Sequence, residues 1–423
     1  MSNNIYGLVG KKLGHSYSKL IHNMLGNDSY ELYELTPEEL GPFLKQDNIC
    51  GLNVTIPYKI DALASCDVIS EEVEAIGAAN TLVRRNGRLH AFNTDMYGFI
   101  YMTKSAGIDV SGKKVAVLGT GGASRAIVAG LKNMGAGEIV MISRKGPVTY
   151  SDIDTFKDAQ VVVNTTPVGM FPDNLSTPTD LSVFENLTGV LDIVYNPHLT
   201  GLLLKAESLG IPFAGGLTML VAQAKRAHQL FFGEIETNEI NMESFSSDPD
   251  IDRITAKLVR DAQNIALIGM PGSGKTSIAN ALAKLTGREV IDLDAEITKT
   301  AGKPIPQIFA DDGEEVFREM ETAEIAKAGA LSGKILSLGG GAVTKIRNYP
   351  LLHQNSIIIE IRRDLDTLDT AGRPLSVDLE ALRKMEVVRR PMYDSFRDFE
   401  IINDSTIEAA AQKLVDVFNN VDI

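Results

Sequence analysis

Short runs of aliphatic residues alternate with amphipathic, helix-like stretches along almost the whole chain. The helix-like stretches include one from Thr94-Asp95 to about Ala106 and one that ends near Met134. Strands are predicted at residues 5–9, 50–56, 79–84, 113–118, 138–143, 160–164, 191–195 and 264–268. This alternation is typical of α/β architecture, which we therefore predict for the whole chain.

The length of 423 residues suggests roughly two to three domains. Residues 234–250 are acidic, rich in Ser and Asn and poor in large apolar residues, which predicts a linker, and Asp248-Pro249 suits the start of a helix after it. We predict domains over 1–100, 101–215 and 263–423, with a linker and connecting helix over 234–262 and a helix at about 216–233 that returns to the first domain.

Composition and charge narrow the function classes. A formal net charge of −14 argues against nucleic acid as a partner but leaves small anionic substrates open. Cys50 and Cys66 are the only cysteines, which favours a reducing compartment. The start of the chain does not resemble a signal peptide, and no apolar run approaches membrane-spanning length. We expect a cytoplasmic protein without a membrane partner.

Two glycine-rich turns of different chemistry suggest two nucleotide sites. GMPGSGKT at 269–276 fits the phosphate-loop pattern between a strand and a helix, so Lys275 can reach the β- and γ-phosphates and the Thr276 hydroxyl can hold Mg²⁺. The turn GTGGAS has Gly119 and Gly121 at two of the three dinucleotide-fingerprint positions.

The strand after the second turn ends in Ser143-Arg144-Lys145, a hydroxyl and two cations where NAD enzymes usually have an acid. That chemistry suits the 2′-phosphate of NADP. The alternative for either turn is an ordinary strand-to-helix connection.

Three stretches near the start carry polar side chains suited to a polyol substrate. GHSYS supplies Ser16 and Ser18, NVTIPYK places Asn53, Thr55 and Lys59 across a strand end and a proline-started helix, and FNTD ends on Asp95 at a helix start. The lysine and the aspartate could together move a proton. Each residue alone is more often a solvated surface group.

The last third carries anion-binding and metal-binding candidates. EVIDLD puts Asp292 and Asp294 on the same face of a predicted strand, where one could serve the metal water shell and the other orient a hydroxyl nucleophile. Arg318 stands one helical turn before Glu321, and the run Gly339-Gly340-Gly341 could form a backbone nest for an anion. A solvated helix and a tight turn remain open for these two motifs. Arginines that suit a phosphoryl group or a carboxylate are Arg373, Arg389 and Arg390.

These motifs resemble two known families. Residues 1 to about 235 resemble shikimate dehydrogenase through YGLVG, LGHSYS, GLNVTIPYK, GAANTL, NTD, GTGGASRA, VVNTTPVGM, LDIVYNPHLT and GGLTMLVAQA. Residues from about 263 to 423 resemble shikimate kinase through GMPGSGKTS, DLDAEI, GEEVFREME, LSLGGGAV, GRPL and RRPMY.

The resemblance implies a two-lobed dehydrogenase half, with a substrate domain and a Rossmann NADP domain, followed by a P-loop kinase domain with a parallel sheet. It also implies a bifunctional enzyme of chorismate biosynthesis that reduces 3-dehydroshikimate with NADPH and then phosphorylates shikimate with Mg-ATP.

The dehydrogenase resemblance implies roles for particular residues. Lys59, paired with Asp95, would be the catalytic proton donor and acceptor. Residues that would hold the shikimate skeleton are Ser16, Ser18, Thr55, Lys59, Asn80, Asp95, Tyr195 and Gln223. Residues that would contact NADP are Gly119, Thr120, Gly121, Gly122, Ala123, Ser143, Arg144, Lys145, Ile193 and Gly216.

The kinase resemblance implies a second set. Lys275 would be catalytic, and Thr276 and Asp292 would serve Mg²⁺. Residues that would contact ATP are Gly272, Ser273, Gly274, Lys275, Thr276, Ser277 and the lid residue Arg373. Residues that would bind shikimate are Asp294, Arg318, Gly340 and Arg389.

The chain also departs from the family patterns. Lys12 and Lys19 stand where the dehydrogenase family has prolines. Only 19 residues separate Arg144 from Asn164, too few for the family's usual helix. The alternatives are a metabolite-sensing regulator that has lost its catalytic groups, or a protein with one active half. Oligomeric state and the use of quinate stay open.

Overall fold

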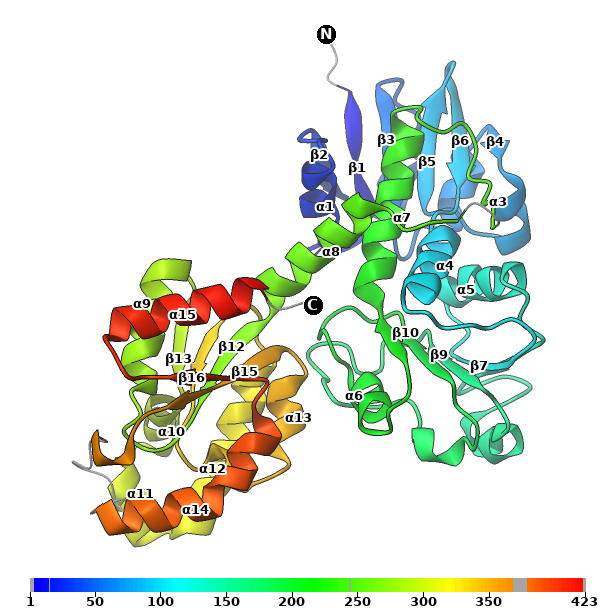
Figure 1. Ribbon diagram of the computed structural model, residues 1–423. Helices are drawn as coiled ribbons and strands as arrows, with labels where there is room; N and C mark the ends of the chain where they lie inside the picture. Colours follow the sequence, from blue (N-terminus) through cyan, green and yellow to red (C-terminus); the bar gives the residue numbers. More distant parts are fainter. Residues whose placement is uncertain (1–3, 15, 243–244, 368–378, 421–423) are drawn as a thin grey trace. The chain divides into compact units, whose positions relative to one another are not determined.

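The computed structural model describes residues 4–14, 16–242, 245–367 and 379–420 (Figure 1). The chain forms two compact units, one built mainly from residues before 257 and the other mainly from residues 257–423. None of the described helices is both long and apolar enough to span a membrane.

The first sheet of the first unit is mixed and has six strands in the order β2-β1-β3-β5-β6-β4. The pairs β3–β5 and β5–β6 are antiparallel, and the other pairs are parallel. The strands are β1 (Ile5–Gly10), β2 (Tyr30–Glu34), β3 (Ile49–Val54), β4 (Val68–Ile69), β5 (Thr81–Arg85) and β6 (Arg88–Phe92). The helices are α1 (Ser18–Met24), α2 (Pro37–Leu44) and α3 (Glu71–Ile76).

The second sheet of this unit is parallel and has five strands in the order β11-β10-β9-β7-β8. Its strands are β7 (Lys114–Leu118), β8 (Glu138–Ile142), β9 (Val161–Asn164), β10 (Gly189–Asp192) and β11 (Phe213–Gly215). The helices are α4 (Asp95–Ser105), α5 (Gly122–Asn133), α6 (Gly201–Ser208) and α7 (Gly216–Phe231). β9 and β10 are buried at every residue, as expected for parallel strands covered on both faces.

Helices α4 and α7 pack directly against each other. Gly98 of α4 allows this, because a Cβ there would lie 2.5 Å from the Met219 carbonyl oxygen of α7. At this crossing, Asp95 at the start of α4 and Gln223 on α7 both accept hydrogen bonds from the Asn80 side-chain amide. The packing of two helices therefore assembles part of the site described below.

The second unit is built on a parallel five-stranded sheet in the order β13-β14-β12-β15-β16. Its strands are β12 (Asn264–Ile268), β13 (Val290–Asp292), β14 (Ile335–Ser337), β15 (Ser356–Arg362) and β16 (Phe399–Ile402). Its helices are α9 (Lys275–Thr286), α10 (Leu293–Ala301), α11 (Ile305–Asp311), α12 (Glu314–Gly329), α13 (Asn348–His353), α14 (Leu379–Phe396) and α15 (Ile407–Asn420). Helix α8 (Pro249–Ala262) precedes β12 in the chain.

Successive residues of β12 serve opposite faces of this sheet, because side chains of a strand alternate. Ile265 and Leu267 pack with residues of α9 and α15, whereas Ala266 and Ile268 pack with residues of α12 and α14. The strand is buried at all positions, which explains why it reads as a continuous apolar run in the sequence.

The structure confirms the predicted α/β architecture and corrects two element predictions. The strand predicted at 191–195 ends at Asp192, because the Asp192 carboxylate accepts hydrogen bonds from the Val194 amide and from Asn164, and so bends the chain out of the ladder. Residues 56–60 form turns that lead into a short 3₁₀ helix at Asp61–Ser65, so the helix predicted to start at Pro57 is wrong. The hydroxyl of buried Tyr58 donates to the Leu35 carbonyl oxygen and anchors this turn.

Candidate active sites

The residues predicted to hold a polyol meet at one cavity of about 460 Å³ in the first unit. They come from α1, from turns and loops next to strands of both sheets, and from α4 and α7, far apart in the sequence. Those that line the cavity are Ser16, Ser18, Thr55, Lys59, Asn80, Asp95, Tyr195 and Gln223. Ile193 and Gly216, which were predicted to contact the dinucleotide, line the same cavity. A substrate there and a dinucleotide on the second sheet would therefore adjoin.

The lysine and the aspartate form the closest charged contact of this cavity. The Lys59 ammonium lies 2.5 Å from Asp95 Oδ2, and the two side chains are 20% and 12% exposed. Asn80 donates to the other carboxylate oxygen at 2.9 Å, which fixes the orientation of the Asp95 side chain. A second acceptor for the Asn80 amide is Gln223 Oε1, at 3.3 Å.

The backbone around Lys59 is held from two sides. The amide of Ala79, just before Asn80, donates to the Lys59 carbonyl oxygen at 2.8 Å. The neighbouring Tyr58 is fully buried and anchored to Leu35. The turn therefore presents a lysine that is partly exposed to the cavity from a fixed main chain.

Asn53 supports the site through buried hydrogen bonds, although the sequence suggested that it would offer its amide to the substrate. It lines the cavity but is 5% exposed. Its Oδ1 accepts from the Tyr30 hydroxyl at 2.8 Å and lies 3.1 Å from His22 Nε2. Its Nδ2 donates to the Asn80 carbonyl oxygen. Burial, together with the nearby His228, lowers the pKa of His22 to about 3, so His22 is neutral.

The glycine-rich turn that begins at Gly119 has the geometry of an anion-binding loop. Gly119 has φ of +105°, and a Cβ there would lie 2.8 Å from Thr165 Oγ1. Helix α5 follows with Gly121 as its N-cap, and no side chain caps the first amides. Residues 120–122 are exposed. Uncapped, exposed amides at the start of a helix fit a phosphate group. Ser124, at the third fingerprint position, is buried and donates to the Gly121 carbonyl oxygen at 2.6 Å.

The strand tip after β8 presents its two cations but not its hydroxyl. Arg144 and Lys145 are exposed. Ser143 is buried, and its hydroxyl donates to the Lys145 carbonyl oxygen at 2.8 Å. Ser143 therefore shapes the turn. The exposed Arg144 and Lys145 carry positive charge of the kind that would suit a 2′-phosphate. Between Arg144 and β9 the chain forms a 3₁₀ helix at Tyr150–Phe156 in place of the family's α-helix, as the short spacing predicted.

The second unit has a cavity of about 850 Å³ at the phosphate loop. Predicted residues that line it are Gly272, Gly274, Lys275, Thr276, Ser277, Asp292, Asp294, Arg318, Gly340 and Arg389. Lys275 is buried, and its ammonium donates to the carbonyl oxygens of Gly269 and Met270 at 2.9 and 3.0 Å. Ser273 is fully buried and does not line the cavity. Arg373 lies outside the described residues.

A hydroxyl and a carboxylate meet at the position expected for the metal ion. Thr276 Oγ1 donates to Asp292 Oδ2 at 2.9 Å and lies 3.1 Å from Ser337 Oγ. Oxygen ligands of this kind suit Mg²⁺. The prediction that Asp292 and Asp294 share a strand face is wrong. Asp292 ends β13 and caps α10 by accepting from the Ala295 amide, so Asp294 lies in the first turn of that helix.

Arg318 and Glu321 line this cavity and form a buried ion pair. Arg318 Nη1 lies 2.7 Å from Glu321 Oε2, and the side chains are 5% and 1% exposed. Burial raises the pKa of Glu321, and Arg318 opposes the rise. Arg318 Nε and Glu321 Oε1 are buried and have no hydrogen-bond partner among the described residues. A Cβ on Gly341 would lie 2.1 Å from Arg318 Nη1, so any side chain there would displace the guanidinium.

Helix α14 brings Arg389 to the same cavity. Arg389 Nη1 and the Tyr393 hydroxyl both donate to the Gly340 carbonyl oxygen, at 2.9 and 2.6 Å. The glycine run thus ties α14 to the end of β14, and its amides are held next to Arg318 and Arg389. Arg318 and Arg389 supply two cations, which is the chemistry that a carboxylate substrate needs.

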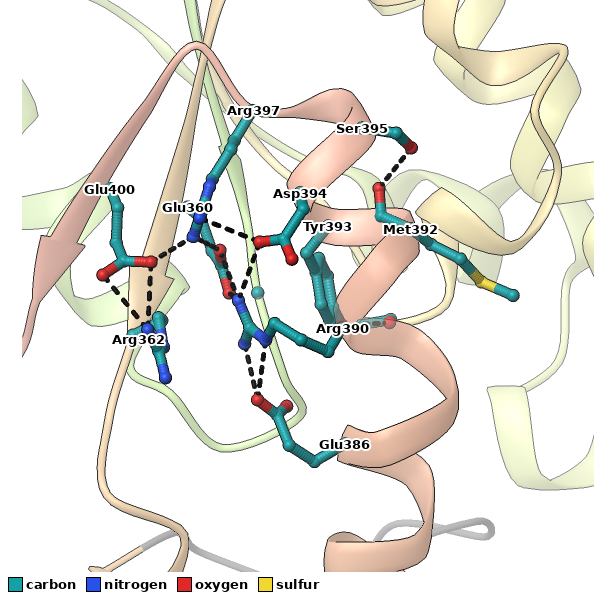
Figure 2. A network of polar contacts seen from close by, with 12 residues as sticks. Glu360, Arg362, Glu386, Arg390, Met392, Tyr393, Asp394, Ser395, Arg397 and Glu400 are labelled. Atoms are coloured by element: carbon teal, nitrogen blue, oxygen red, sulfur yellow. Dashed lines mark hydrogen bonds and ion pairs between the residues drawn. The ribbon is translucent and has the colours of Figure 1, made fainter.

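An ion-pair network holds α14 against the sheet (Figure 2). Glu360 of β15 is fully buried, and its Oε2 accepts from Arg390 Nη1 and Arg397 Nη1 at 2.9 and 2.7 Å. Arg390 also pairs with Glu386, one turn earlier in α14, at 2.6 Å. Glu360 is paired in register with Ile268, the last residue of β12 before the phosphate loop. The network therefore joins the helix that carries Arg389 to the strands below that loop.

Sequence reasoning missed several residues of these sites. Lys12 lines the first cavity, and its position in place of a family proline was the available signal. Tyr393 lay within a quoted motif without a role, and Glu360 gave no local signal at all.

Comparison with known proteins agrees with this geometry. Residues 271–419 match the family model of shikimate kinase, and residues 8–82 match that of the shikimate dehydrogenase substrate binding domain. The shikimate dehydrogenase (NADP(+)) of Clostridium beijerinckii is 37% identical over 246 residues, which span 53% of this chain and 91% of the relative.

Two solved structures resemble the dehydrogenase half. A chorismate mutase/shikimate 5-dehydrogenase fusion from Clostridium acetobutylicum is 32% identical with a TM-score of 0.54, over 61% of this chain and 98% of that one. The shikimate 5-dehydrogenase of Thermus thermophilus, solved in complex with NADP(H) and shikimate, is 30% identical with a TM-score of 0.52, over 60% of this chain and 99% of that one.

Proposed function

The chain belongs to the shikimate dehydrogenase family in its N-terminal half and carries a shikimate kinase domain after it, and we propose that it is a bifunctional enzyme of chorismate biosynthesis. The first half reduces 3-dehydroshikimate to shikimate with NADPH, and the second half phosphorylates shikimate with Mg-ATP. The observation that carries the proposal is that one chain holds two cavities, each lined by charged and polar residues of the kind its reaction needs. Lys59 and Asp95 lie 2.5 Å apart at one cavity, and Lys275 lies at the other with Arg318 and Arg389.

In the reduction, the chain's residues hold the substrate and move one proton. NADPH, when bound, supplies the hydride to the carbonyl carbon. The Lys59 ammonium stabilises negative charge that develops on the carbonyl oxygen and donates a proton to it. Asp95 orients the ammonium, and Asn80 orients Asp95 through its other oxygen. Ser16, Ser18, Thr55, Tyr195 and Gln223 supply hydroxyl and amide groups for the rest of the ring.

NADP binding is assigned to the turn and strand tip of the second sheet. Residues 119–123 would hold the pyrophosphate, with main-chain amides from Thr120 onward because the Gly119 amide donates to the Ile142 carbonyl oxygen. Arg144 and Lys145 would pair with the 2′-phosphate. Ile193 and Gly216 line the substrate cavity and would contact the nicotinamide end. Ser143 contributes by shaping the strand tip.

In the phosphorylation, the chain's residues position a hydroxyl and neutralise charge. Mg-ATP, when bound, supplies the phosphoryl group and the metal charge. Gly272 and residues 274–277 would hold its phosphates, Lys275 would neutralise charge on the transferring group, and Thr276 with Asp292 would hold the metal ion. Asp294 accepts the proton of the shikimate hydroxyl. Arg318, Arg389 and the main chain at Gly340 bind the substrate carboxylate.

The remaining assignments follow from composition. We propose a cytoplasmic location, because Cys50 and Cys66 are both free and a reducing compartment keeps them so. The partners that we propose are the two small-molecule substrates and their cofactors. The metabolite-sensing regulator is the second candidate, but the retention of Lys59, Asp95, Lys275 and Asp294 favours an enzyme.

The test supplies purified protein with 3-dehydroshikimate, NADPH and Mg-ATP and measures both NADPH loss and shikimate 3-phosphate. We expect both products. Lys59→Ala should lower the dehydrogenase rate by about 10²- to 10⁴-fold and leave phosphorylation of added shikimate nearly normal, because it removes only the proton donor. Lys275→Ala should do the reverse, and a mixture of the two variants should restore shikimate 3-phosphate through free shikimate.

Two outcomes would contradict this proposal. If either variant silences both reactions in a folded protein, the halves do not act as separate enzymes. If wild-type protein turns over neither substrate, the regulator becomes the better description.

A further inference from the structure

The segment predicted as a linker is attached to the dehydrogenase half along α4 and α7. Arg85 donates to the Glu236 carbonyl oxygen. The Tyr101 hydroxyl accepts from the Asp248 amide at 2.8 Å, and Lys225 pairs with Asp250 at 2.9 Å. These contacts belong to the first compact unit. The segment therefore does more than join two domains.

Asn238 is the most buried polar residue among the described residues of this segment. It is 2% exposed, and every polar atom of its side chain has a partner. Its Nδ2 donates to the Asn93 carbonyl oxygen at 2.8 Å and to Glu72 Oε1 at 3.3 Å. Its Oδ1 accepts from Arg226 Nε at 3.1 Å. A single side chain thus joins α3, the residue before Thr94-Asp95, and α7.

Asn93 links Asn238 to Asp95, the proposed catalytic aspartate. The Asn93 side chain accepts from the Asp95 amide at 3.1 Å and donates to the Ala78 carbonyl oxygen at 2.8 Å. Ala78 stands two residues before Asn80, which itself binds Asp95. Asn238 therefore contacts Asn93 directly and is linked to Asn80 through Asn93 and Ala78, the residues whose hydrogen bonds support Asp95 beside Lys59.

We propose that Asn238 is a positioning residue for the reduction of 3-dehydroshikimate. It holds the Asn93 main chain and the α7 side chain of Arg226 in one arrangement, and so sets where Asp95 and Gln223 meet the substrate. This inference rests on the proposed dehydrogenase function. It makes the connecting segment part of the support of the dehydrogenase site.

The substitution Asn238→Asp isolates this role because it preserves size and the acceptor for Arg226. It removes both donated hydrogen bonds and sets a carboxylate against the Asn93 carbonyl oxygen and Glu72, which repel it. Loss of a buried hydrogen bond of this kind predicts a fall of about fivefold to tenfold in kcat/KM for 3-dehydroshikimate. Asn238→Ala removes all three contacts, so its kcat/KM for 3-dehydroshikimate should fall at least as far.

The measurement compares the full-length variants in both reactions. We expect the KM for 3-dehydroshikimate to rise, the KM for NADPH to stay within twofold, and the kinase rate on added shikimate to stay unchanged. The matched control is Glu239→Ala. The Glu239 side chain is exposed, and its neighbouring contact to Arg226 uses the main-chain carbonyl, which the substitution keeps. This control should match wild type in every constant.

Two results would overturn the inference. Wild-type KM values in Asn238→Asp would show that Asp95 does not depend on Asn238. A lower kcat with both KM values unchanged would indicate only a smaller folded fraction. Failure of the proposed function is recognised separately, because wild-type protein and Glu239→Ala would then also fail to reduce 3-dehydroshikimate.

Discussion

Removal of one arginine from the Glu360 network should destabilise the kinase half while sparing the dehydrogenase half. The perturbation is Arg390→Met, which preserves length and packing but removes the charge beside fully buried Glu360 (Figure 2). Arg397 remains 2.7 Å from the same carboxylate. Glu386 also loses its partner, but at 19% exposure it regains some contact with water.

The magnitude follows from the position of Glu360. Two unit charges about 4 Å apart interact by about 4 kcal/mol at an effective dielectric constant of about 20. Arg390 is 23% exposed, so recovered hydration of its site offsets part of this, and Arg397 still neutralises Glu360. We expect a loss of about 2–3 kcal/mol, below the roughly 3–5 kcal/mol typical when a buried charge loses its only partner. With a urea m-value of about 2 kcal/mol/M, the midpoint should fall by about 1–1.5 M.

The assay follows the two activities of one sample through a urea series, since the chain has no tryptophan to report unfolding. The matched control is Arg383→Met on the same helix. Arg383 pairs with Asp366 at 3.0 Å, but the two side chains are 60% and 63% exposed. A surface pair contributes about 0–1 kcal/mol, so its kinase midpoint should move by less than about 0.5 M.

A thermodynamic cycle with Glu360→Gln separates charge from packing. Once Glu360 is neutral, Arg390→Met should cost less than about 1 kcal/mol, because no buried charge is left behind. The reasoning is refuted if Arg390→Met lowers the kinase midpoint no further than Arg383→Met does. It is equally refuted if the loss is as large in the Glu360→Gln background.

Two further predictions concern the dehydrogenase half. Arg144→Ala with Lys145→Ala should raise the KM for NADPH by about 10- to 150-fold and leave that for NADH unchanged, because a charge-assisted contact contributes about 1.5–3 kcal/mol; equal losses with both cofactors would contradict the assignment. Burial lowers the pKa of His22 to about 3 from 6.5, so the unfolded chain binds more protons in acid. The urea midpoint of dehydrogenase activity should therefore fall as pH drops below about 6.5, and His22→Gln should flatten that slope.

The sequence was informative where local backbone chemistry decides structure. The phosphate loop was predictable because its glycines sit at positive φ, for example Gly272 at +83° and Gly274 at +96°, between a fully buried strand and a helix. The interval between Arg144 and Asn164 likewise holds a 3₁₀ helix at Tyr150–Phe156 in place of the family's α-helix, whose absence the short spacing predicted.

Local chemistry also produced the errors. Pro57 suits a first helical turn, but a buried Tyr58 ring and its hydrogen bond to Leu35 impose another path. Asp292 and Asp294 have the spacing of one strand face, but Asp292 stops the strand by capping α10. In both places a side chain that binds the main chain overrode the periodicity of the segment.

The supporting contacts could not be predicted because they join residues remote in the sequence. Asn238 and Asn93 are 145 residues apart, and Arg390 and Glu360 are 30 apart on different elements. Neither pair has a pattern, since Asn and Arg occur on any polar surface. Residues that touch substrate follow motifs that chemistry restricts, whereas residues that hold them need only reach a buried partner. Asn238 is such a residue, because it holds Asn93 and Arg226 without lining the cavity.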